Sequence, residues 1–92
     1  MGKSIIQEDR TCYFCGKLTG LECHHVFGGV ANRPVSEKYG LKVWLCFEHH
    51  LGKDGVHYNK KMMDSLHRIG QKEFEENHTR EEFIKEFGRS YL

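Results

Sequence analysis

The sequence predicts a small α+β domain in which two short strands and a short helix precede two longer helices. The chain has 92 residues, enough for one domain. Residues 21–27 and 42–46 are rich in the apolar, β-branched and aromatic side chains typical of strands, and a short helix is expected to begin at Phe47. Residues 58–77 carry apolar side chains at helical spacing.

Two helices are expected in the C-terminal part. The apolar positions of the first are Met62, Met63, Leu66, Ile69 and Phe74. Thr79 and Glu82 form a capping box that opens the last helix, and Gly88 is its expected end. No repeat or linker interrupts the chain, so residues 1–92 are expected to form one domain with a core at about 11–60 and a helical part at about 58–92.

The segment between the two strands is expected to be a loop. Residues 30–40 contain the run Asn32-Arg33-Pro34, which favours a bend, and they end at Gly40. The sequence therefore predicts that the strands are joined by irregular chain.

Four residues have the spacing of zinc ligands. Two residues separate Cys12 from Cys15, and two separate Cys46 from His49. Three thiolates and one imidazole complete a tetrahedral shell with no open position, so the ion would be structural. Cys23 could replace His49 in a four-cysteine site, but it has no partner at this spacing and is expected to be a small buried residue.

The chain shows neither a signal-peptide run nor an apolar stretch long enough to span a membrane. A cytoplasmic location is therefore expected. Thiols stay reduced in the cytoplasm, which favours metal binding over disulfides. Because no stretch is long and apolar enough to span a membrane, a membrane is not an expected partner. A redox role for Cys12 and Cys15 is disfavoured because no βαβ pattern precedes them.

Histidine is abundant, with seven residues in the chain. Five of them are clustered, as His24-His25, as His49-His50 and as His57. Neutral imidazole binds divalent ions and also accepts a proton from water near neutral pH. The remaining two, His67 and His78, lie in or beside the predicted helices and are expected to be structural.

A strand with two adjacent histidines, a second strand and a helix that opens with a histidine together resemble the HNH family of endonucleases. The leading Cys-x-x-Cys falls in the order found in that family, and the resemblance covers about residues 11–60. The chain is also similar to short single-domain HNH proteins of bacteriophages, including at residues 36–40, 55–57 and 87–92. The resemblance implies a zinc-stabilised ββα-metal finger that hydrolyses DNA and leaves 5′-phosphate and 3′-hydroxyl ends.

The resemblance also implies roles for the histidines. His25 would be the general base that deprotonates the attacking water. His24, His50 and His57 would hold a catalytic ion, Mg²⁺ or Mn²⁺. The asparagine that the family places before the second strand has no clear match, and Asn32 lies earlier. A backbone carbonyl, another side chain or Asn32 must therefore orient His25.

Positive charge is concentrated in the middle of the chain. Residues 33–61 carry six basic and three acidic side chains, whereas residues 62–92 carry five and seven. The cations expected to contact phosphates are Arg33, Lys38, Lys42, Lys53 and Lys60. DNA is thus the expected partner. The resemblance also allows a homodimer or a phage recombination or packaging protein as partner, in the host cytoplasm.

The alternative hypothesis is a non-catalytic zinc-finger module that binds DNA or a protein. Under that hypothesis only the zinc ligands matter. A structural finger does not require His24, His25 and His50, so a shared site for these three histidines would favour the nuclease.

Overall fold

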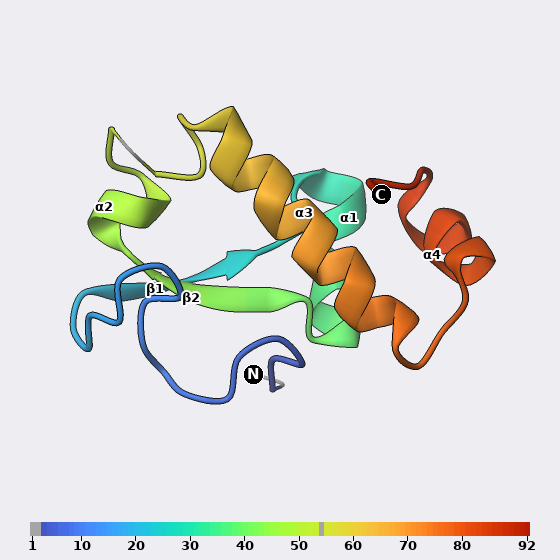
Figure 1. Cartoon of the computed structure of the whole chain (residues 1–92), viewed down its shortest axis with the longest axis horizontal. Helices are drawn as coiled ribbons and strands as arrows, with labels where there is room; N and C mark the ends of the chain where they lie inside the picture. The colour runs from blue at the N-terminus through green and yellow to red at the C-terminus, as the bar shows by residue number, and fades with distance from the viewer. Residues whose placement is uncertain (1–2, 54) are drawn as a thin grey trace.

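The structure, a computed structural model, describes residues 3–53 and 55–92. A two-stranded antiparallel sheet consists of β1 (Leu21–His25) and β2 (Lys42–Cys46). Its register places Cys23 opposite Trp44 and His25 opposite Lys42. The helices are α1 (Gly29–Tyr39), α2 (Phe47–His50), α3 (Lys60–Glu75) and α4 (Arg80–Phe87) (Figure 1). The predicted α+β class is confirmed.

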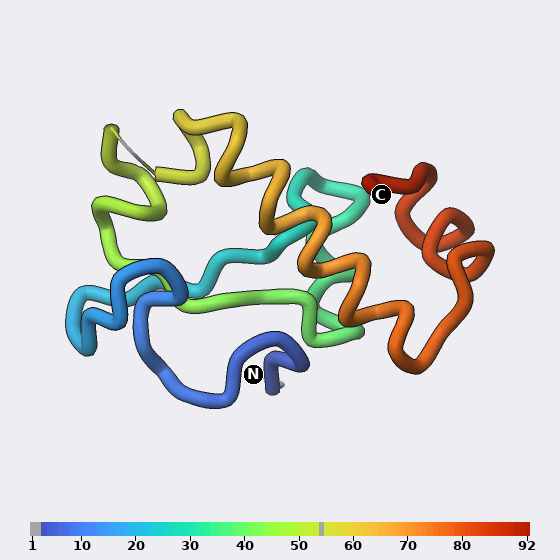
Figure 2. The backbone as a smooth tube through the Cα atoms, in the orientation of Figure 1, coloured from blue at the N-terminus to red at the C-terminus, as the bar shows by residue number. Residues whose placement is uncertain are grey.

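The long helix α3 lies across the end of the sheet, with α2 at one end of the molecule and α4 at the other (Figures 1 and 2). Leu66 and Phe74 are the buried apolar side chains of α3. Gly70 lies between them, and a Cβ atom there would come 2.9 Å from Cγ1 of Val26 and 3.0 Å from Cε2 of Phe27. The missing side chain therefore lets α3 approach the segment that follows β1.

An aromatic cluster fills the core between β1, α3 and α4. The ring of Phe27 lies 5.2 Å from Phe83, 4.6 Å from Phe87 and 5.2 Å from Tyr91, centroid to centroid. Aromatic rings bury large apolar areas, and these tilted and edge-on contacts suit their quadrupoles. The C-terminal tail is thus part of the core.

Gln71 is a fully buried polar residue that ties this tail to α3. Its side-chain oxygen accepts a hydrogen bond of 2.6 Å from the backbone N–H of Tyr91. Its amide nitrogen donates to Oγ of Ser90 at 3.0 Å. Each polar end of the buried side chain therefore has a partner.

The prediction of a loop over residues 30–40 is wrong, because these residues form α1. Val35 and Tyr39, one helical turn apart, pack against the core. The buried Ser36 hydroxyl donates to the carbonyl of Phe27 at 2.8 Å and accepts from the N–H of Phe27 at 3.1 Å. These contacts hold the helix although Pro34 lies inside it and removes a backbone donor.

The other predicted elements agree more closely. The strand at residues 42–46 is confirmed, and β1 ends two residues before the expected position. The long helix, Lys60–Glu75, is two residues shorter at each end than the predicted 58–77. It begins directly after its N-cap, Asn59, whose side chain accepts from the N–H of Met62.

The capping box that opens the last helix is confirmed. Oγ1 of Thr79 accepts from the N–H of Glu82 at 3.1 Å, and the carboxylate of Glu82 accepts from the N–H of Thr79 at 3.0 Å. The helix ends at Gly88, which has a left-handed φ of 87°.

The segment before β1 runs beside the outer edge of β2. The N–H of Ile5 donates to the carbonyl of Gly40 at 2.9 Å, and the N–H of Trp44 donates to Oε1 of Gln7 at 2.9 Å. These bonds satisfy backbone groups that the edge of a two-stranded sheet would otherwise expose.

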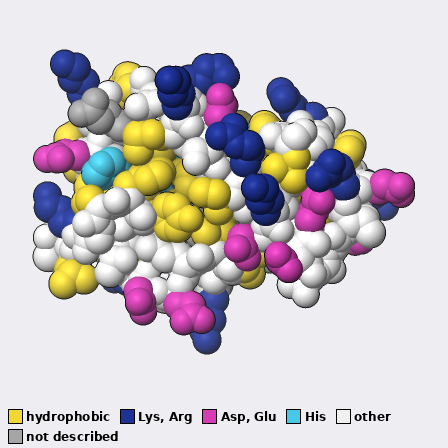
Figure 3. Space-filling view, in the orientation of Figure 1, with side chains coloured by type: hydrophobic (Ala, Val, Ile, Leu, Met, Phe, Trp, Pro, Cys, Tyr) yellow, Lys and Arg dark blue, Asp and Glu magenta, His cyan; other side chains and the backbone are white. Residues whose placement is uncertain are grey.

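On the face seen in Figure 3, hydrophobic side chains gather in the middle, and many Lys and Arg side chains lie along the upper part. Among the helices of the described residues, none has the length and apolar character that crossing a membrane requires.

Candidate metal centres

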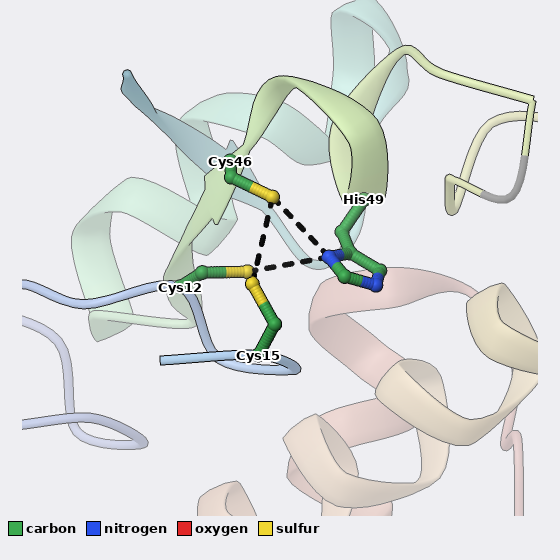
Figure 4. A group of neighbouring side chains, drawn as sticks. All are labelled: Cys12, Cys15, Cys46 and His49. Atoms are coloured by element: carbon green, nitrogen blue, oxygen red, sulfur yellow. Dashed lines mark hydrogen bonds between the residues drawn. The ribbon is translucent and has the colours of Figure 1, made fainter. Parts of the chain in front are cut away.

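The first candidate centre brings together the four predicted zinc ligands. Figure 4 shows the side chains of Cys12 and Cys15 on one side and those of Cys46 and His49 on the other, converging on one point. Their ligand atoms all lie within 4.8 Å of one another. Nδ1 of His49 lies 3.2 Å from Sγ of Cys46 and 3.6 Å from Sγ of Cys12, and the Sγ atoms of Cys15 and Cys46 are 3.8 Å apart.

Local backbone bonds shape this cluster. The N–H of Gly16 donates to the carbonyl of Cys12 at 2.8 Å, and the N–H of Cys12 donates to the carbonyl of Lys17 at 2.9 Å. Gly16 adopts a φ of 77°, which an L side chain rarely allows. The N–H of Tyr13 bonds the carbonyl of Trp44 at 2.9 Å and ties this turn to β2.

The donor set and its spacing fit zinc. Thiolates bind zinc at about 2.3 Å, so two sulfurs of a tetrahedral shell lie about 3.8 Å apart. Burial opposes ionisation of the Cys12 thiol, but hydrogen bonds from the backbone at Cys46, Cys15 and Phe14 lower its pKa to about 6. All four cysteines of the chain are free thiols. The cluster is therefore compatible with a structural zinc site.

Cys23 lies outside this cluster. It is half-buried on β1, less buried than expected, and burial raises the pKa of its thiol. It borders two hollows, one beside the histidines and a larger one of about 640 Å³ under the N-terminal segment.

The second candidate centre consists of His24, His50 and His57, each of which was predicted to hold a catalytic ion. One ring nitrogen from each lies within 4.8 Å of the others. The ring centroid of His24 lies 5.3 Å from that of His50 and 5.3 Å from that of His57, and the centroids of His50 and His57 are 5.0 Å apart. The three residues come from β1, from α2 and from the segment before α3.

His24 is the buried member of this set, with 5% of its surface exposed. Burial, followed by the nearby His50 and His57, lowers its pKa to about 3, so the ring is neutral at pH 7. Its Nε2 atom is the one buried side-chain nitrogen or oxygen without a hydrogen-bond partner in the described part of the chain. An unpartnered buried nitrogen is costly, and a metal ion would satisfy it.

The other two histidines are also suited to metal binding. Nδ1 of His50 lies 3.3 Å from Oε1 of Glu22, which leaves Nε2 of His50 free. A carboxylate behind a ring nitrogen is a common support for a histidine ligand. His57 is exposed overall, but partial desolvation of its ring, followed by the charge of the neighbouring His50, lowers its pKa.

His25 lies beside the three clustered histidines. A hollow of about 230 Å³ is lined by Cys23, His24, His25, Arg33, His50 and His57. Nε2 of His25 is bonded to Oε1 of Glu37 at 2.9 Å. Glu37, a residue of α1, is therefore the group that contacts the predicted base, and sequence reasoning missed it because α1 was expected to be a loop.

Lys42 departs from its expected role. It is only 4% exposed, and its ammonium group donates to Oε2 of Glu37. Because its charge is buried and paired, Lys42 does not belong with the exposed cations that DNA would meet. The expectation that it contacts phosphate is wrong for this reason.

The remaining predicted cations are exposed. Arg33 lines the histidine hollow, while Lys38 lies over the ring of Tyr39, 5.2 Å from its centroid. Lys60 is paired with Asp64 at 2.8 Å. Only Arg33 is thus placed at the candidate site by the geometry, and Lys53 and Lys60 lie on the segment before α3 or at its start.

The donor set of the second centre indicates which ions fit. Among the residues that the structure describes, it offers three imidazole nitrogens and no carboxylate. Mg²⁺ prefers oxygen ligands, whereas imidazole suits borderline transition ions. The residues therefore fit Zn²⁺ or a similar late transition ion better than they fit Mg²⁺, and Mn²⁺ lies between the two.

Comparison of the chain with protein-family models, with curated proteins and with solved structures yields no match. The molecule is thus described by its own geometry, as a small α+β domain with a cysteine and histidine cluster that can bind metal. The HNH resemblance remains a prediction.

Proposed function

We propose that this chain is a metal-dependent endonuclease of the HNH type that hydrolyses phosphodiester bonds in DNA. The observation that carries the proposal is the meeting of four histidines at one hollow. Three of them cluster at metal-binding distances, and the fourth, His25, borders the same space. A zinc finger that only binds a partner has no need for this second set.

The side chains of the hollow suit the roles that hydrolysis requires. His25 is placed to take a proton from water as that water attacks phosphorus. Arg33 lines the same hollow and offers its guanidinium to the phosphate oxygens. The bond from phosphorus to the 3′ oxygen then breaks, and the departing oxygen takes a proton from solvent water, which leaves 5′-phosphate and 3′-hydroxyl ends.

His24, His50 and His57 would hold the divalent ion. When bound, the ion supplies Lewis-acid stabilisation of the charge that builds on the phosphate and on the departing oxygen. The burial of His24 keeps its ring neutral, which is the form that binds a metal.

The test is cleavage of supercoiled plasmid by zinc-loaded protein in the presence of Mn²⁺, Zn²⁺ or Mg²⁺. We expect cleavage, with higher activity in Mn²⁺ than in Mg²⁺. The variant His25→Ala should lose at least about 100-fold in rate, the usual size of a general-base contribution. His78→Ala is the matched control, because His78 contacts Glu82 and Phe74 in a different part of the fold.

Equal cleavage by the parent and by His25→Ala would contradict the proposal. Binding of the plasmid without cleavage under every ion would instead support the non-catalytic zinc-finger module. End-labelling of the products checks the predicted 5′-phosphate.

A further inference from the structure

The carboxylate of Glu37 binds two side chains, those of His25 and Lys42. Glu37 lies in α1, and its two carboxylate oxygens are shared between Nε2 of His25 and the ammonium of Lys42. His25 and Lys42 are register partners across β1 and β2. The backbone of the sheet therefore fixes the spacing of the two groups that the carboxylate joins.

The carboxylate is held in its ionised form. The hydrogen bond from Lys42, and then that from His25, lower the pKa of Glu37 to about 2. An ionised carboxylate only accepts hydrogen bonds. The hydrogen atom of the bond between Glu37 and His25 must therefore reside on Nε2 of His25.

We propose that Glu37, held by Lys42, is a positioning residue that fixes His25 as the tautomer with its proton on Nε2 and with Nδ1 free to accept a proton from water. The proposal rests on the nuclease function proposed above. It also answers what orients His25, since Asn32 makes no hydrogen bond to this ring in the described part of the chain.

Lys42 determines how the side chain at position 37 can bind His25. Its side chain is buried, so its charge requires a partner of opposite sign. A neutral amide in place of Glu37 has one accepting oxygen for two donors. The buried ammonium of Lys42 would take that oxygen, and the amide N–H groups would then face His25.

The variant Glu37→Gln therefore makes a specific prediction. In this variant Nε2 of His25 must accept a hydrogen bond from the amide, so the ring proton must move to Nδ1. A protonated Nδ1 can no longer take a proton from water. An equivalent tautomer change in serine proteases lowers turnover about 10⁴-fold. We expect a loss of kcat of at least about 100-fold with little change in KM, because the phosphate-binding groups remain in place.

The closing experiment measures the tautomer directly by long-range ¹H–¹⁵N correlation of the His25 ring in the diamagnetic, zinc-loaded protein. The parent is expected to carry its proton on Nε2, and Glu37→Gln on Nδ1. The control is Glu86→Gln, because Glu86 accepts a hydrogen bond of 3.1 Å from Tyr39 on the same helix α1 but makes no contact with His25. It should leave both the tautomer and kcat unchanged.

The two proposals fail separately. A parent with its proton on Nδ1, or a Glu37→Gln variant with parental tautomer and kcat, overturns the role of Glu37 even if the parent cleaves DNA. A parent that never cleaves DNA but shows the tautomer reversal removes the nuclease function and supports the positioning of His25 by Glu37. Even if the variant does not fold, a parental spectrum with the proton on Nδ1 would overturn the proposal.

Discussion

Gly70 of α3 lies directly against Val26, so that a Cβ atom on Gly70 would stand 2.9 Å from Cγ1 of Val26. This contact sets the distance between α3 and the end of β1. His24 lies two residues before Val26, and His57 lies three residues before α3. The close packing of α3 on Val26 therefore also affects the distance between His24 and His57.

Replacement of Gly70 by alanine tests this close approach. The added methyl would contact Val26 and the ring of Phe27, both fully buried. Overpacking costs about 1–3 kcal/mol, and alanine recovers up to about 1 kcal/mol of helix propensity. We expect a net decrease in the free energy of unfolding, measured by urea denaturation. Arg68→Ala, at an exposed position of α3, should change it by less than about 0.5 kcal/mol. Stabilisation by Gly70→Ala would mean that α3 can move away at no cost.

Removal of a cysteine ligand should unfold the domain, whereas removal of the proposed base should not. Cys46→Ser takes one thiolate from the first centre, and in small zinc-binding domains the binding of the ion contributes directly to the free energy of folding. We expect the variant to lose its zinc and its cooperative melting transition. His25→Ala should keep both, as measured by metal content and circular dichroism. Equal losses in the two variants would show that the two centres are not separate.

The number of bound ions tests the second centre independently of activity. After loading with excess Zn²⁺ and desalting, the parent is expected to hold two ions per chain. His57→Ala should hold one and should keep a cooperative melting transition, because His57 is exposed and its loss leaves the cysteine cluster intact. His67→Ala is the control for metal content, since His67 stacks on Phe27 and is not a member of the cluster. Two ions retained by His57→Ala would contradict the assignment.

Burial of His24 predicts a pH dependence of stability. Its pKa is about 3 in the folded protein and ordinarily 6.5, so between these values the unfolded chain binds more protons. The free energy of unfolding should therefore fall as the pH decreases from 6.5 toward 3, by up to about 1.4 kcal/mol per pH unit. Urea denaturation at pH 7, 6 and 5 should show a shallower decrease for His24→Asn than for the parent. Parallel curves would mean that His24 is protonated in the folded state.

The candidate centres could be predicted because short-range spacing determines much of their geometry. Two residues between Cys12 and Cys15 allow both thiols to reach one ion, and the same spacing applies to Cys46 and His49. The adjacency of His49 and His50 likewise places one ring toward each centre once the short helix forms. Such local patterns do not depend on the rest of the fold.

The helix α1 could not be predicted, because the contacts that hold it are distant in sequence. Asn32, Arg33 and Pro34 are locally typical of a bend. The burial of Ser36 against Phe27, together with the packing of Val35 and Tyr39 on the core, outweighs that preference. With α1 missing from the prediction, the contact from Glu37 to His25 was missing as well. Charge alone also gave no sign that Lys42 is buried.

The four-residue helix α2 contributes to both centres, since His49 belongs to the cysteine cluster and His50 to the histidine cluster. A helix of one turn is not stable by itself in water. An ion bound by the thiolates would therefore help to order it, and the position of His50 would depend on that ion as well. An oxidant that attacks the thiols should therefore also disrupt the proposed catalytic site, whereas removal of an ion from the histidines should leave the cysteine cluster assembled.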